Sequence, residues 1–148
     1  MRTLGNILWL VLAGFWLAIG YVLAGILMCL LIVTIPFGVQ AFKLASYTLW
    51  PFGRTVVERP GASPELGCVG NVIWLVLAGI EMAIAHLVAG VLLCLTIIGI
   101  PLGIACFKLI PLALTPFGKE IVPVDQVPPG ATTYDPPPTL GARPPAGG

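Results

Sequence analysis

Two long stretches of the chain carry hydrophobic residues at nearly every position. The first runs from Ile7 to Val33 without a charged side chain, and a near copy of it follows Gly70-Asn71. As an α-helix the first stretch would be about 40 Å long, whereas about 20 apolar residues suffice to cross a bilayer. It also exceeds the roughly 7–15 apolar residues of a signal peptide. The pattern therefore predicts two long membrane-spanning helices, tilted or protruding into the headgroups.

Each apolar stretch ends at an I-P-x-G sequence, which predicts a break in the helix. Proline cannot continue the backbone hydrogen-bond ladder, and a glycine two residues later loosens the turn. We therefore expect helix breaks at Pro36 and Gly38 and again at Pro101 and Gly103.

A shorter segment follows the first break, from Phe37 to Trp50. It carries Gln40, Lys43 and Tyr47 on one helical face. About 14 residues rise only ~21 Å as a helix, which is short of the ~30 Å hydrocarbon core. The pattern predicts a re-entrant or returning helix.

The chain is internally duplicated. A shift of 65 positions carries Gly5-Asn6 onto Gly70-Asn71 and Pro51-Phe52-Gly53 onto Pro116-Phe117-Gly118, with no gap. Such self-similarity indicates a tandem repeat. We expect an all-α integral membrane protein. Its two membrane repeats cover residues 4–57 and 70–122, a linker covers residues 58–69, and a disordered Pro/Gly-rich tail covers residues 123–148.

The composition indicates that most of the chain's surface contacts the lipid bilayer, which is therefore its main expected partner. The chain is 58% hydrophobic and 9% charged, whereas soluble domains carry about 25% charged residues. The net charge of +1 provides no basic field for nucleic acid. The four cysteines form no C-x-x-C pair, so we expect neither a metal site nor a cofactor.

The charges leave two membrane topologies open. If each repeat is a hairpin that returns, five basic residues share one face, namely Arg2, Arg54, Arg59, Lys119 and Arg143. The positive-inside rule would make that face, and both termini, cytoplasmic. If each repeat spans once in inverted orientation, the charge bias between the faces is too weak to orient the protein. The charge pattern favours hairpins.

The repeated motifs resemble a known family. The patterns G-N-[IV]-x-W-L, I-P-x-G-x-x-x-F-K-L and P-F-G-[RK] are similar to those of the YccF family, small bacterial inner-membrane proteins with two copies of one domain. The resemblance covers about residues 4–122. It implies a multi-pass protein of the bacterial cytoplasmic membrane. It implies no activity, because the domain has no known function and no catalytic residues to carry over.

Glu81 and His86 are candidate functional residues because both lie within the second apolar stretch. Their counterparts in the first repeat are Trp16 and Tyr21. Ionisable residues inside a membrane span are expensive and often functional. Five helical residues separate the pair by roughly 140°, so they do not form a local dyad. The simpler interpretation is a structural pairing of each with another helix.

Lys43 and Lys108 occur at the same position of both repeats, in F-K-L. They are candidates for contact with lipid headgroups or a partner. Alternatively, their aliphatic stems lie in lipid while the ammonium groups reach the interface. Trp9, Trp74 and Trp50 lie near segment ends and are expected in interfacial aromatic belts.

The sequence predicts no enzyme, since it lacks a phosphate loop, a nucleophile elbow and an acid pair. The first functional hypothesis is an accessory or structural membrane component, packing with itself or with a larger membrane partner. Small residues four apart could form the packing faces, namely Gly14/Ala18, Gly20/Ala24, Gly79/Ala83 and Ala85/Ala89. The alternative is a small oligomeric transporter or pore with Glu81 and His86 as coupling or gating groups.

Overall fold

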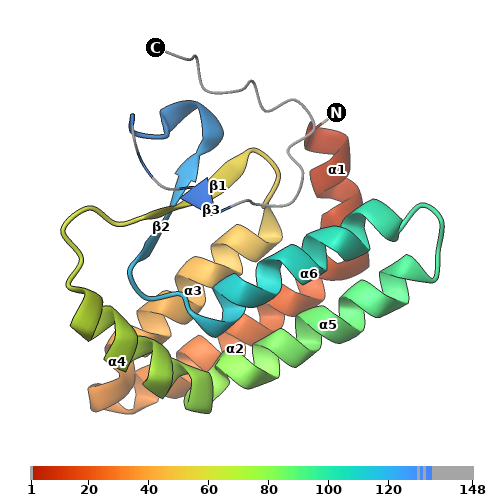
Figure 1. The fold of residues 1–148 in the computed structure, drawn as a ribbon. Helices are drawn as coiled ribbons and strands as arrows, with labels where there is room; N and C mark the ends of the chain where they lie inside the picture. Colours follow the sequence, from red (N-terminus) through yellow and green to blue (C-terminus); the bar gives the residue numbers. More distant parts are fainter. Residues whose placement is uncertain (1, 130, 132, 135–148) are drawn as a thin grey trace.

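The computed structural model describes residues 2–129, 131 and 133–134. In the first repeat a long helix consists of three segments, α1 (Arg2–Trp9), the π-helical turn η1 (Leu10–Gly14) and α2 (Phe15–Leu30). The 3₁₀ turn η2 (Ile32–Thr34) then reverses the chain. Helix α3 (Ile35–Leu49) returns along α2, and strand β1 (Arg54–Glu58) follows (Figure 1).

The second repeat has the same elements in the same order. Its long helix comprises α4 (Pro64–Trp74), η3 (Leu75–Gly79) and α5 (Ile80–Cys94). Helix α6 (Ile100–Leu114) returns along α5, and strand β2 (Lys119–Pro123) follows. The chain continues through the 3₁₀ turn η4 (Val124–Gln126) to β3 (Thr133–Tyr134). Each repeat is therefore a helical hairpin followed by a strand.

The three strands form one antiparallel sheet in the order β2-β1-β3. At the centre of the β1–β2 pair Val56 lies opposite Ile121, its own counterpart in the second repeat. On either side the register pairs Arg54 with Pro123 and Glu58 with Lys119. Pro123 is the counterpart of Glu58 and Lys119 that of Arg54, so the start of each strand lies opposite the end of the other. An approximate two-fold axis therefore passes between Val56 and Ile121 and relates the two repeats.

The same two-fold axis relates the helices, and the two hairpins are antiparallel. The rings of Tyr21 and His86, which are equivalent residues on α2 and α5, lie 5.8 Å apart. Phe37, beside the turn of the first hairpin, packs 5.2 Å from Phe117, which precedes the strand of the second. The turn end of one hairpin thus lies beside the strand end of the other, as Figure 1 shows.

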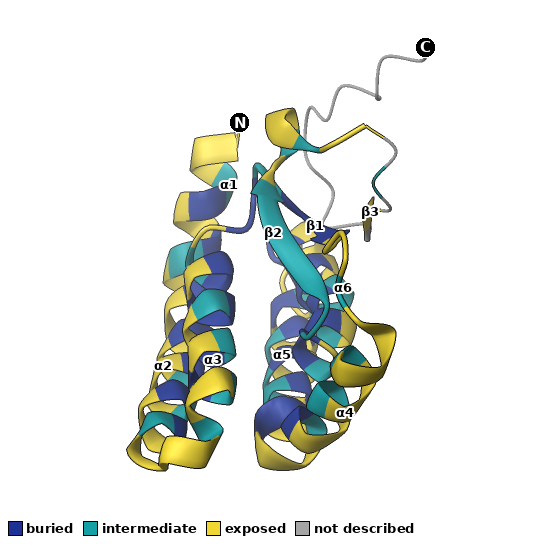
Figure 2. Ribbon diagram, turned by 90° about the vertical axis from the view of Figure 1, so that its left-hand side faces the viewer, coloured by how far each residue is buried: buried dark blue, intermediate teal, exposed yellow. Residues whose placement is uncertain are grey.

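The elements form three layers. Near the middle of α3, Lys43 Nζ donates to the carbonyl of Lys119 in β2 at 3.0 Å, so α3 lies directly beneath the sheet. On the other side of α3, Gly38 contacts Cys29 and Gly25 of α2. The order from one side to the other is sheet, returning helices and long helices. Figure 2 shows the two hairpins next to each other with β2 above them.

The expectation of an all-α fold was wrong. The chain is mainly helical, but the sheet excludes an all-α fold, and β1 crosses the expected boundary between repeat and linker. The start of the expected disordered tail forms η4 and β3; residues 135–148 of that tail lie outside the described residues. The sequences T-V-V and E-I-V are β-branched and suit a half-buried strand, and Val56 and Val57 are buried.

The helix breaks lie before the prolines rather than at them. The chain reverses at residues 31–34 and 95–99, and Pro36 and Pro101 lie in the first turns of α3 and α6. Proline suits this position because the first amides of a helix have no intrahelical acceptor. Gly38 and Gly103 lie inside these helices, where a Cβ would collide with Cys29 and Cys94. These glycines allow close packing of the hairpin arms.

Candidate functional site

An asparagine near the start of each long helix joins it to the P-F-G turn that ends the hairpin. The Asn6 side-chain amide donates to the carbonyl of Phe52 at 2.9 Å and accepts from the Phe52 amide at 2.9 Å. In the second repeat Asn71 makes the same pair of bonds with Phe117, at 3.3 Å and 2.8 Å. We call each of these pairs an asparagine latch. The recurring G-N dipeptide was the signal in the sequence, but sequence reasoning assigned it no role.

A tryptophan adds a second bond next to each latch. The indole Nε1 of Trp9 donates to the carbonyl of Thr48 at 2.6 Å, and Trp74 donates to that of Ala113 at 2.7 Å. Both acceptors lie at helix ends, where carbonyls have no intrahelical partner. Trp9 and Trp74 are 0% exposed, so placing them in interfacial belts was wrong; Trp50 is partly exposed, at 39%.

The π-helical turns make room for these indoles. A Cβ on Gly14, the last residue of η1, would lie 2.5 Å from Trp9 Nε1 and 2.9 Å from the Thr48 carbonyl. Only glycine therefore lets the ring lie against this carbonyl. The same sequence, L-V-L-A-G, forms η3 directly after Trp74 in the second repeat. The glycine, asparagine and tryptophan of the repeated motif thus act together to close each hairpin.

The structure does not bring Glu81 and His86 together. His86 is 1% exposed, and its Nδ1 lies 2.8 Å from the Met82 carbonyl, to which it donates one turn back on α5. Its ring packs against Tyr21 beside the two-fold axis. Glu81 is exposed on a different face of α5. A coupling or gating role for either residue stays a prediction.

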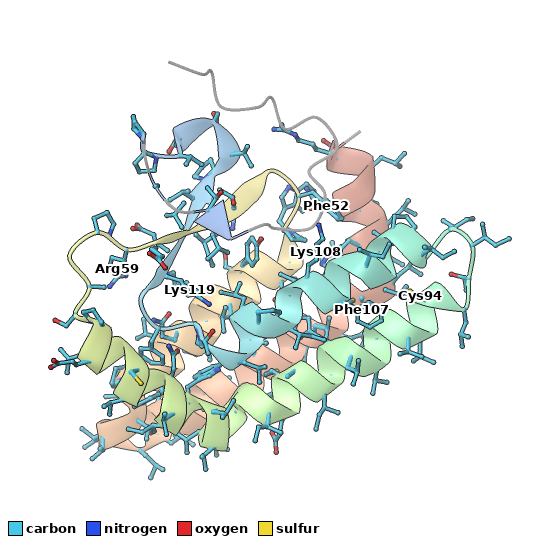
Figure 3. The ribbon with its side chains drawn as sticks, in the orientation of Figure 1. Phe52, Arg59, Cys94, Phe107, Lys108 and Lys119 are labelled. Carbon is cyan, nitrogen blue, oxygen red and sulfur yellow. The ribbon has the colours of Figure 1, made fainter. Side chains whose placement is uncertain are left out.

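Lys43 and Lys108 lie on the side of the returning helices that faces the sheet. Lys43 bonds to β2, as described above, and Figure 3 shows Lys108 at the corresponding place on α6. Beside them, Lys119 Nζ donates to Thr115 Oγ1 at 2.8 Å. Burial lowers the pKa of Lys119, and the carboxylate of Glu58 partly offsets this shift. Contact with lipid headgroups stays a prediction for both repeated lysines.

Among the described residues, no cluster of three His, Cys, Asp or Glu side chains could hold a metal ion. An apolar groove runs between the two long helices and is lined by residues of α2 and α5, including Trp16, Leu17, Gly20, Met82, Ala85 and Leu92. It contains no convergent polar groups. The helical stretches Arg2–Leu30 and Pro64–Cys94 are long and apolar enough to cross a membrane by length and composition.

Comparison with known proteins identifies the family. The model of the YccF inner membrane component domain matches twice, over residues 4–54 and 69–119. Two relatives are each named inner membrane protein YccF, from Escherichia coli (strain K12) and Shigella flexneri. Each is 35% identical over 133 residues, which cover 84% of this chain and 90% of the relative. No solved structure matches. The chain belongs to the YccF family of bacterial inner membrane proteins.

Proposed function

We propose that the protein is an accessory or structural component of the bacterial inner membrane that packs with itself or with a larger membrane protein. One observation carries this proposal. The polar residues of the repeated motifs bond to the chain's own backbone, through the asparagine latches and the tryptophan bonds. What the helices present outward is mostly apolar surface, which suits packing against lipid and other helices.

The exposed side chains of the long helices support this function. Trp16, Leu23 and Leu27 on α2 are 67%, 61% and 67% exposed, and Val76 in η3 is 79% exposed. Apolar patches of this kind mark sites of contact with membrane or protein. Some small residues expected to contact a partner pack inside the chain instead. Ala18 is 3% exposed, for example, and Gly14 lies against Trp9.

Extraction in a mild detergent, followed by native mass spectrometry, tests the proposal. We expect a defined homo-oligomer or a stoichiometric membrane partner, and a lone monomer under all mild conditions would contradict it. Trp16→Ala should weaken the assembly if the partner covers the groove between α2 and α5. Leu30→Ala is the matched control, because Leu30 is also exposed, at 74%, but does not line that groove.

The alternative function is a small transporter or pore. The observation in its favour is the antiparallel two-fold relation of the repeats, since inverted repeats recur in transporters. The positions of Glu81 and His86 weigh against it, because one is exposed and the other is buried on a different face. In liposomes, Glu81→Gln should abolish a pH-dependent flux while leaving expression intact. A wild-type protein without any flux would exclude this function.

A further inference from the structure

The position of the sheet constrains how this molecule can lie in a bilayer. The sheet lies on the two-fold axis, above the middle of the hairpins, and carries charged residues such as Arg54, Glu58 and Lys119. If the helices crossed the bilayer, the sheet would lie at mid-depth beside them. Its charges and the open edges of β2 and β3 would then meet hydrocarbon. Open sheet edges do not occur in lipid, and charges there are expensive.

The tips of the hairpins lead to the same conclusion. Ile32 and Val33 at the first turn are 83% and 87% exposed, and Ile97 and Ile98 at the second are 89% and 73% exposed. Because the hairpins are antiparallel, a spanning orientation would place these apolar tips at opposite aqueous surfaces. With the helices parallel to the membrane plane, both tips remain in lipid.

The long helices are also not straight over their full length. Figure 1 shows α1 rising beside the sheet while α2 runs on below α3, with the π-helical turn η1 between them. Arg2 accordingly lies next to Gly53, the residue before β1. The first turns of α4 share a pocket with Glu58 and Lys119 of the strands. The remaining segments, of 16 residues in α2 and 15 in α5, rise only about 22–24 Å, less than the ~30 Å hydrocarbon core.

The basic residues among those that the structure describes lie on the sheet side of the molecule. Arg54 and Lys119 belong to the strands, and Lys43 bonds to β2 from below. Arg59 donates its backbone amide to Gly118, next to β2. Figure 3 shows Arg59, Lys108 and Lys119 between the helices and the sheet or beside it. Clustered basic residues at a membrane surface attract anionic headgroups.

We propose that this protein lies in one leaflet of the bilayer, with its helices parallel to the membrane plane. The sheet and its basic residues face the anionic lipid headgroups, and the outer face of α2 and α5 lies near the bilayer centre. Two helix layers reach roughly 20 Å below the sheet, so this face does not reach the headgroups of the opposite leaflet. Glu81 faces lipid in either orientation and does not distinguish them. The proposal rests on the inner-membrane location and is independent of the accessory function.

Single-cysteine accessibility tests the orientation in the full chain. The probes are Cys68, which is exposed, together with Thr3→Cys and Asp125→Cys on the sheet side, and Ile32→Cys and Ile97→Cys at the turns. Each is placed in a background in which the other native cysteines are alanine. A membrane-impermeant maleimide is applied to spheroplasts and to inside-out vesicles, and SDS-denatured samples show that every thiol can react.

We expect the three sheet-side cysteines to react from the same membrane face and the two turn cysteines to react from neither. Two other outcomes would overturn the proposal. Antiparallel spanning hairpins would expose Thr3→Cys and Ile97→Cys on one face and Cys68 and Ile32→Cys on the other. Parallel spanning hairpins would expose both turn cysteines on the face opposite the sheet-side probes.

Depth-dependent quenching distinguishes a thiol in lipid from one covered by protein. A bimane label on Ile32→Cys should be quenched by lipids brominated near the ends of their acyl chains, and not by aqueous iodide. The control label, on Asp125→Cys, should show the opposite preference because Asp125 is exposed beside the sheet. Iodide quenching at Ile32→Cys would overturn the proposal.

Discussion

Replacing Asn6 by alanine should destabilise the protein more than replacing its counterpart Asn71. The Asn6 side chain is 1% exposed, and both of its bonds to the Phe52 backbone measure 2.9 Å. Without the side chain, a buried amide and a buried carbonyl lose their partners at the end of the first hairpin. Each of these two unsatisfied groups costs about 1–3 kcal/mol, so the free energy of unfolding should fall by roughly 2–6 kcal/mol.

The second repeat provides the matched control. Asn71 is only partly buried, and its donated bond is longer, at 3.3 Å. Water can therefore replace part of what Asn71→Ala removes, and we expect a loss of about 1–2 kcal/mol. The assay is reversible unfolding in mixed detergent micelles by titration with SDS, followed by tryptophan fluorescence. The Trp9 indole lies 6.1 Å from the Phe52 ring and should report the loss.

Two results would refute this reasoning. One is a change below about 0.5 kcal/mol for Asn6→Ala, which is the range of ordinary surface substitutions. The other is an equal or larger effect of Asn71→Ala, since burial would then not determine the strength of the latch. Val39→Ala, at an exposed apolar position of α3, serves as the surface reference.

Two further predictions concern the indole site and the sheet. Gly14→Ala should lower the free energy of unfolding by about 1–3 kcal/mol through overpacking, because an added Cβ would lie 2.5 Å from Trp9. Gly79→Ala should lower it less, because there the nearest Trp74 atom lies 3.0 Å from the Cβ position. The reverse order in the same SDS titration would contradict this. Burial lowers the pKa of Lys119 in the folded protein below its ordinary value of 10.5. Between the folded and the unfolded pKa the unfolded chain binds more protons, so the free energy of unfolding should rise as the pH rises towards 10.5. Lys119→Gln should flatten this rise, measured by unfolding at a series of pH values, and an unchanged slope would argue against the assigned cause.

Much of the local architecture could be predicted from hydrophobicity and repetition. The charge-free run from Ile7 to Val33 indicated a long helix, and the shorter segment after Pro36 indicated a returning one. These features depend on local sequence, where backbone preferences and apolar length dominate. The position of the break was less accurate, because proline interrupts a preceding helix but is also favoured in the first turn of the next.

The relative direction of the repeats could not be predicted from the sequence. Two similar hairpins bury similar faces whether they are parallel or antiparallel, and the charge pattern favours one spanning orientation over another without fixing the direction of the repeats. The register that places Val56 opposite Ile121 fixes the antiparallel arrangement. It depends on two strands of five residues each, which lie almost entirely within the segments that we interpreted as the ends of the two repeats.

The candidate site was predicted only in part. The repeated G-N, W and P-F-G residues carried the family resemblance, but their contacts join positions about 40 residues apart and have no local signature. Conversely, Glu81 and His86 attracted attention because ionisable residues are rare in apolar runs. The structure places them on different faces of α5, as their five-residue spacing indicated.

The distance between the two hairpin turns tests the antiparallel arrangement most directly. Ile32 and Ile97 are each twelve residues beyond Gly20 and Ala85, the equivalent positions at the two-fold axis. At 1.5 Å per residue each turn lies about 18 Å from the axis, in opposite directions. Spin labels on Ile32→Cys and Ile97→Cys in lipid nanodiscs should therefore give a double electron-electron resonance distance of about 36 Å or more. A main distance below about 20 Å would place the two turns at the same end, as in parallel neighbouring hairpins, and would contradict the fold described above.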